Sequence, residues 1–170
     1  MDRKPVSVKS YANIAIVKYW GKADAERMIP STSSISLTLE NMYTETKLSF
    51  LPEDTTGDVM YIDDELQGEK ETTKASKVLD LFRTNPNQHV KIETWNNMPT
   101  AAGLSSSSSG LSALVKAANE LFQVGKTQFE LAQIAKFASG SSSRSFFGHW
   151  QLGIRIVVMF TKWKQTSNWL

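Results

Sequence analysis

A run of five serines, Ser105–Ser109, contains the residue types that most clearly point to chemistry. The run follows Pro99 and Gly103 and leads directly into a segment with helical apolar periodicity. Backbone N–H groups in the first turn of a helix lack partners and carry partial positive charge, and serine hydroxyls add donors without bulk. This combination suits phosphate oxygens, so we expect a phosphorylated ligand, in particular a nucleotide. The alternative is a flexible serine linker, and the loop is not a Walker loop because no Gly-Lys-Ser/Thr follows its glycine.

Two further segments carry cations that suit anionic ligands. Lys18 lies among the apolar residues 12–20 and Lys22 follows it. Either the two ammonium groups form an anion site, or Lys18 extends to the surface. The segment Ser139–Ser145 is small and rich in hydroxyl groups, and its Arg144 suits bidentate binding of a carboxylate or phosphate. Taken by itself, such a segment is also typical of an ordinary loop.

The composition is that of an ordinary soluble domain. The chain has 170 residues, of which 41% are hydrophobic and 21% charged, which is enough for one substantial core. It contains no cysteine, which excludes disulfides and fits a cytoplasmic location. Its two histidines, His89 and His149, are isolated, so they offer no metal site. We expect no signal peptide, no membrane span and no nucleic-acid partner.

The elements that must position these groups follow the order strands first and helices later, which favours an α+β fold. Period-two alternation predicts strands at Val6–Ser10, Ser34–Leu39, Thr44–Phe50 and Val90–Trp95, and a hairpin at Val59–Ile62 followed by two aspartates. Helices are predicted from two apolar stripes and from a capping box at Thr127–Glu130 that opens a helix through Phe137. The stripes are Ala75, Val78, Leu79 and Phe82, and Leu111, Leu114, Val115, Ala118 and Phe122.

Taken in order, the three segments resemble one protein family. Residues 12–22 read A-N-I-A-I-V-K-Y-W-G-K, the serine loop begins P-T-A-A-G-L-S-S-S at Pro99, and residues 139–145 read S-G-S-S-S-R-S. This set is similar to mevalonate diphosphate decarboxylase of the GHMP kinase superfamily, over about Val6 to Gly148. The serine loop alone indicates only the superfamily, whereas the other two segments select the decarboxylase.

The resemblance implies a GHMP-kinase-type N-terminal domain and an ATP- and Mg²⁺-dependent reaction of isoprenoid biosynthesis. ATP would phosphorylate the tertiary hydroxyl of mevalonate diphosphate, and loss of that phosphate would drive decarboxylation to isopentenyl diphosphate. By the same resemblance Lys18 lies beside the reacting hydroxyl, Arg144 binds the substrate carboxylate and Asn13 orients Arg144. The other implied site residues are Tyr19, Lys22, Ser139 and Ser141 for the substrate, and Gly103, Ser105, Ser106, Ser107 and Ser108 for the nucleotide. The metal ligands and a homodimer stay open.

The family is longer than this chain, and its second half supplies a catalytic aspartate. The resemblance ends abruptly after Gly148, and residues 149–170 hold three of the five tryptophans and no acidic residue. We interpret residues 1–148 as a truncated domain and residues 149–170 as out-of-frame sequence, because a back-translation with one inserted base reads as a charge-balanced continuation. The alternative is a divergent terminus with a strand at Ile154–Phe160.

Two other functions are compatible with these motifs. One is a related GHMP small-molecule kinase that acts on mevalonate or phosphomevalonate, against which the Lys-Tyr-Trp-Gly-Lys string argues. The other is a non-catalytic remnant that binds nucleotide. On either the decarboxylase or the remnant interpretation, we expect the 170-residue chain to be inactive by itself, because the presumed catalytic aspartate lies beyond residue 170.

Overall fold

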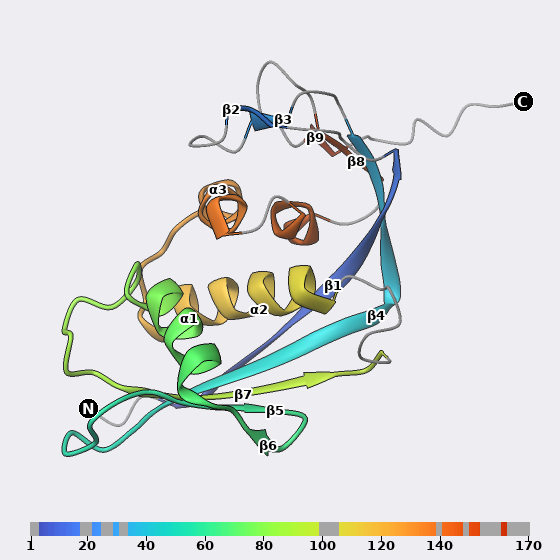
Figure 1. The fold of residues 1–170 in the computed structure, drawn as a ribbon. Coiled ribbons are helices and arrows are strands. Elements are labelled where there is room, and N and C mark those ends of the chain that lie inside the picture. Colours follow the sequence, from blue (N-terminus) through green and yellow to red (C-terminus); the bar gives the residue numbers. More distant parts are fainter. Residues whose placement is uncertain are drawn as a thin grey trace, which may run out of the picture.

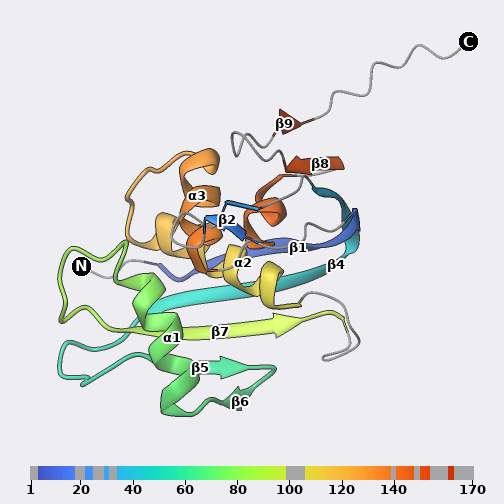
Figure 2. The same ribbon diagram turned by 45° about the horizontal axis from the view of Figure 1, so that its top comes forward.

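The computed structural model describes residues 4–17, 22–24, 29–30, 34–98, 106–138, 141–147, 150–153 and 161–162. Within these ranges, seven strands form one sheet and the helices lie on one of its faces (Figures 1 and 2), which confirms the predicted α+β fold. The sheet order is β6-β5-β7-β4-β8-β9, and β1 also pairs with β4. Its strands are β1 (Val6–Val17), β4 (Ser34–Phe50), β5 (Val59–Ile62), β6 (Glu65–Leu66), β7 (Val90–Asn96), β8 (Trp150–Gly153) and β9 (Thr161–Lys162).

Strand β4 is the centre of the sheet and contains a bulge. β1 pairs with it antiparallel, and residues 40–42 of β4 fall outside the register between Tyr11 and Ala12 of β1. β7 pairs with the C-terminal half of β4 and β8 with its N-terminal half. The sequence predicted two strands here, Ser34–Leu39 and Thr44–Phe50. They form one strand because the bulge interrupts the alternation without ending the pairing.

Strand β1 is longer than its predicted extent of Val6–Ser10. It continues to Val17, and its second part pairs with residues 35–39 of β4. The segment after Ala12 is therefore extended as far as Val17, because this stretch forms sheet hydrogen bonds. Two short strands, β2 (Lys22–Asp24) and β3 (Ile29–Pro30), follow as a separate antiparallel pair that was not predicted.

The predicted hairpin after Val59–Ile62 is confirmed. Its turn residues Asp63 and Asp64 have φ angles of 49° and 66°. Two consecutive positive φ angles are those of a type I′ turn, which matches the twist of the flanking strands. β5 and β6 therefore pair antiparallel, while β5 pairs parallel with β7 on its other side.

Three helices lie on the same side of the sheet (Figure 1), α1 (Glu69–Leu79), α2 (Ser106–Leu121) and α3 (Gln128–Ala138), and α3 packs against α2 and the turn at residues 142–146. The predicted apolar stripes lie in α1 and α2, and Phe82 and Phe122 follow just beyond the helix ends. The capping box of α3 is also confirmed. The Thr127 backbone N–H donates to Glu130 Oε2 at 2.8 Å, and the Glu130 N–H donates to Thr127 Oγ1 at 3.4 Å.

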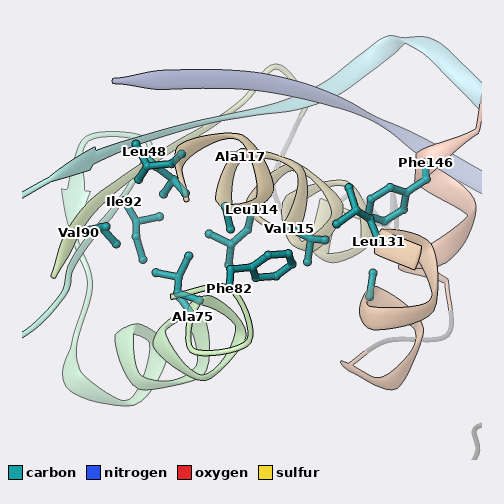
Figure 3. Close-up of a cluster of buried hydrophobic side chains, with 14 of the residues drawn as sticks. Leu48, Ala75, Phe82, Val90, Ile92, Leu114, Val115, Ala117, Leu131 and Phe146 are labelled. Carbon is teal, nitrogen blue, oxygen red and sulfur yellow. The ribbon is translucent and has the colours of Figure 1, made fainter. Parts of the chain in front are cut away.

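An apolar core holds α1 and α2 on the sheet (Figure 3). Leu48 of β4 lies opposite Ile92 of β7, and both are fully buried. Val115 of α2 and Leu79 of α1 complete the same cluster. Each such side chain contributes about 1.5–3 kcal/mol by leaving water. This core therefore fixes the position of α2, whose other half borders the candidate site.

Beside the apolar core lies a buried ionic cluster, the Asp58 cluster, formed by Asp58, Ser76, Arg83 and the Val90 N–H. Asp58 Oδ2 accepts hydrogen bonds from Arg83 Nη2 and Ser76 Oγ, both at 2.6 Å, and Asp58 Oδ1 accepts one from Val90 N at 2.9 Å. Burial alone would raise the pKa of Asp58, but these hydrogen bonds outweigh burial and lower the pKa below its ordinary value of 3.8. The cluster ties α1 to β7.

Two predictions concern parts of the chain where the description is partial. The alternative strand at Ile154–Phe160 lies outside the described residues, and the out-of-frame origin of residues 149–170 stays a prediction. Strand β8, at residues 150–153, pairs with Ser34–Leu37 of β4. As for membranes, the described part of the chain has no helix with the length and apolar character that a membrane span requires.

Candidate active site

The Arg144-bearing segment is a buried 3-10 turn, η1 (Ser142–Phe146), and it is held by the first strand. Asn13 of β1 donates from Nδ2 to the Ser141 carbonyl at 3.2 Å and to Ser145 Oγ at 2.8 Å. Asn13 and Arg144 are each only 5% exposed. Asn13 thus ties both ends of the turn that carries Arg144. The sequence favoured an ordinary loop for this string taken by itself, and burial against β1 and α2 explains the ordered turn.

The first half of α2 faces the sheet with hydroxyl groups in place of apolar side chains. Ser10 Oγ and Ser112 Oγ lie 2.5 Å apart, and Thr44 Oγ1 and Ser109 Oγ lie 2.7 Å apart. All four side chains are fully buried. We call these four residues together with Lys116 the hydroxyl cluster. Buried hydroxyls need partners, so this cluster holds the N-terminal half of α2 in one register on β1 and β4.

Lys116 links the other members of the hydroxyl cluster to η1 (Ser142–Phe146), which we call the Arg144 turn. Its Nζ donates to Ser10 Oγ at 3.3 Å and to the Ser145 carbonyl at 3.2 Å, and it lies 5.0 Å from the centre of the Phe146 ring. Ser10 Oγ donates to the same Ser145 carbonyl at 3.1 Å. Burial lowers the pKa of Lys116 to about 8, so the ammonium is still charged at neutral pH. Within the described residues, no carboxylate forms an ion pair with it.

Helix α3 holds the turn from its other side. The side-chain amide of Gln128, at the start of α3, donates to the Phe146 carbonyl. Together with Asn13 and Lys116, this contact means that three elements donate hydrogen bonds to the backbone of residues 141–146. The position of Arg144 therefore depends on β1, α2 and α3 at once.

The N-terminus of α2 differs from those of the other two helices in charge. The first turns of α1 and α3 carry acidic residues, Glu69 with Glu71 and Glu130 respectively, whereas the first turn of α2 carries none. Acidic side chains complement the positive end of a helix, and the first turn of α2 lacks the complement that α1 and α3 carry. Ser107 in this turn is exposed and Ser108 is buried.

The structure describes some of the predicted site residues and not others. Asn13 and Ser141 are brought together by a hydrogen bond, and Arg144 lies in the same turn. Ser107 and Ser108 lie in the first turns of α2. For Lys22 and Ser106 only the backbone is described, in β2 and α2. The predicted residues outside the described ranges are Lys18, Tyr19, Gly103, Ser105 and Ser139.

Sequence reasoning missed Ser10, Thr44 and Lys116. One signal for Lys116 was present, because Ser109, Ser112 and Lys116 recur at spacings of three and four residues. That spacing places them on one face of a helix, next to the apolar stripe. No comparable signal marked Ser10, whose partner Ser145 lies 135 residues away in the sequence.

Comparison with known proteins shows a family match for most of the chain. Residues 10–155 match the family model of the diphosphomevalonate decarboxylase-like N-terminal domain. The diphosphomevalonate decarboxylase of Saccharomyces cerevisiae is 38% identical in an alignment of 164 positions that covers 86% of this chain and 41% of that protein.

Solved structures give the same result. The mevalonate pyrophosphate decarboxylase of Streptococcus pyogenes is 58% identical with a TM-score of 0.89, over 98% of this chain and 52% of that one. MDDEF, solved in complex with MVAPP, AMPPCP and magnesium, is 40% identical with a TM-score of 0.74, over 89% of this chain and 47% of that one. The chain thus spans about half the length of these relatives, or somewhat less.

Proposed function

Because the chain belongs to the family of diphosphomevalonate decarboxylase-like N-terminal domains, we propose that it forms the anion-binding half of an enzyme that decarboxylates mevalonate diphosphate to isopentenyl diphosphate with ATP. The observation that carries the proposal is that the first and third motifs are joined by hydrogen bonds, and that the helix after the serine loop is bonded to the same strand as the first motif. Asn13 of the first motif bonds to Ser141 and Ser145 of the third. Ser10, in the same strand, bonds to Ser112 in the helix that follows the serine loop.

Arg144 is the residue that we assign to the substrate carboxylate. A guanidinium offers two parallel donors to a carboxylate, and this geometry is lost with a lysine. Asn13 acts on Arg144 indirectly, by fixing the turn at Ser141 and Ser145. Ser139 and Ser141 add hydroxyl donors for the substrate, and Lys18, Tyr19 and Lys22 are assigned to the reacting hydroxyl and the diphosphate, as the family resemblance implies.

The nucleotide is assigned to the serine loop and the N-terminus of α2. Gly103 and Ser105–Ser108 would hold its phosphates with N–H and hydroxyl donors, and the acid-free first turn of α2 supports this assignment. When bound, ATP would supply the phosphoryl group that makes the tertiary hydroxyl a leaving group. Phosphate would then depart with the C–O electrons. At the same time the C–C bond to the carboxylate would break, and a C=C bond would form.

Magnesium is assigned to the nucleotide phosphates, because Mg²⁺ is commonly held by substrate phosphates and water. The relative solved with AMPPCP and magnesium supports this assignment. In the described ranges, no three His, Cys, Asp or Glu side chains form a group that could hold a metal ion. A cytoplasmic location and a homodimer stay predictions.

The test measures ATP-dependent release of carbon dioxide from mevalonate diphosphate. Because the chain spans about half the length of its relatives, residues 1–148 are joined to the remaining half of the Streptococcus pyogenes enzyme. We expect this fusion to release carbon dioxide, and we expect Arg144→Lys to lower kcat/KM by about a hundredfold through loss of the bidentate contact.

A matched control makes the same substitution at the buried Arg83, in the Asp58 cluster. Arg83→Lys should lower stability but leave the KM for mevalonate diphosphate unchanged. ATP consumption without release of carbon dioxide would instead indicate a kinase. A fusion that folds but neither consumes ATP nor releases carbon dioxide would refute the proposed activity.

A further inference from the structure

We propose that Lys116 is a positioning residue, whose ammonium clamps the Ser145 carbonyl and thereby sets the presentation of Arg144 to the anionic substrate. The part of this inference that concerns the substrate rests on the proposed function. The part that concerns the turn stands on the geometry of Lys116 alone. Neither the sequence motifs nor the family resemblance assigns a role to this lysine.

The contacts of Lys116 are directed at the turn and not at a balancing charge. Its Nζ bonds to the Ser145 carbonyl, one residue after Arg144, at 3.2 Å. Its other acceptor, Ser10 Oγ, is itself bonded to that carbonyl at 3.1 Å. Two donors from two different elements, α2 and β1, therefore converge on a single backbone oxygen.

A partly buried ammonium without a carboxylate partner is unfavourable for folding. If Lys116 served the fold alone, a methionine would fill the same space, and the Ser145 carbonyl would keep Ser10 as its donor. What methionine cannot supply is the second donor at the Ser145 carbonyl and a positive charge behind the Arg144 turn. A role in positioning thus predicts that Lys116→Met keeps or raises the stability of the fold while it weakens ligand binding.

The first arm of the test needs no ligand. Hydrogen exchange of the amides of residues 142–147 is measured in the 170-residue chain and in Lys116→Met. We expect exchange in this peptide to be about tenfold faster in Lys116→Met, with exchange in α1 unchanged and the unfolding midpoint equal or higher. Lys116→Arg, which keeps the charge and the donor, should restore most of the protection.

The matched control is Lys136→Met in α3. Lys136 is also buried and its pKa is also lowered by burial, but no hydrogen bond joins it to the described residues of the turn. We expect this variant to leave exchange of residues 142–147 unchanged. Equal exchange in Lys116→Met and the parent chain, or an acceleration spread evenly over all helices, would overturn the positioning role.

The second arm titrates mevalonate diphosphate into the same proteins by calorimetry. Lys116→Met should bind about tenfold more weakly than the parent, and Lys136→Met should bind equally well. If the parent chain does not bind this compound, the proposed role of this half in binding the substrate is rejected, while the exchange experiment still decides the role of Lys116. Unchanged affinity in a Lys116→Met protein with faster exchange would reject the link from the turn to the substrate.

Discussion

The Asp58 cluster and the hydroxyl cluster place charges inside the same domain in opposite ways. The Asp58 carboxylate is 2% exposed and is matched by an arginine, a serine and a backbone N–H. The Lys116 ammonium has two neutral oxygens as acceptors and no described ion pair. A matched buried charge serves the fold, because each partner offsets the burial of the other. An unmatched cation opposes folding, and the positioning role that we propose for Lys116 accounts for its presence beside the Arg144 turn.

The largest difference in stability between the two clusters is expected when the arginine of the Asp58–Arg83 ion pair is removed. Arg83→Met leaves Asp58 buried without its cation and should lower the free energy of unfolding by about 3–5 kcal/mol. The same replacement at Lys116 should leave it equal or higher. Urea denaturation of both variants tests this contrast, and a comparable loss in both would show that Lys116 also serves the fold.

A smaller effect is expected from a single hydrogen bond to the Asp58 carboxylate. Ser76→Ala removes the 2.6 Å donor to Asp58 Oδ2, and we expect a loss of about 1.5–3 kcal/mol in denaturant unfolding, as for bonds to charged groups. Ser7→Ala is the control, because Ser7 also donates to a carboxylate, Glu45 Oε1, but at an exposed site. The free energy of unfolding of Ser7→Ala should stay within about 0.5 kcal/mol of that of the parent. Equal losses in Ser7→Ala and Ser76→Ala would contradict the importance of burial.

Acid provides the next test, through the lowered pKa of Asp58. The folded pKa lies below the ordinary value of 3.8, so the carboxylate contributes stability above that pH and loses the contribution as the pH falls through the folded pKa. Asp58→Asn should therefore be much less stable than the parent at neutral pH, and the gap should narrow below about pH 4. Unfolding curves at several acidic pH values measure the gap, and a constant gap would contradict the pKa direction.

Alkali should act in the opposite sense on Lys116. Its folded pKa of about 8 lies below the ordinary 10.5, so between these values the unfolded chain holds the extra proton. The free energy of unfolding should consequently rise with pH across this interval. Lys136 contributes in the same direction, since its pKa is also lowered. The rise should be smaller in Lys116→Met than in the parent, and an identical rise in both would show that Lys116 titrates normally.

Local patterns in the sequence predicted the apolar half of this fold well. Leu114, Val115 and Ala118 were placed on one helical face, and all three are buried in the core. Apolar burial is not directional, so periodicity alone identifies it. The capping box at Thr127–Glu130 was equally predictable, because its two partners are three residues apart.

The candidate site was predictable only in its motifs. The bond from Ser10 to the Ser145 carbonyl and the bonds from Asn13 to the Arg144 turn join residues more than a hundred positions apart. A hydroxyl or amide in a strand carries no mark of its distant partner. The bulge at residues 40–42 escaped prediction for a related reason, since it is visible only in the register between β1 and β4.

The chain order of the strands has a consequence for how the protein is made. The pairing of β4 with β1 and with β7 can form once residue 96 has been synthesised, because both pairs lie within residues 6–96. The segment that satisfies Ser10 and Asn13 at residues 141–145 emerges some 45 residues later, after α2 and α3. During synthesis, which lets N-terminal parts organise first, these polar groups must stay hydrated on a sheet that is already formed. The Arg144 turn is thus the last of the described parts of the candidate site to be synthesised, and the site is assembled only when this turn docks on β1 and α2.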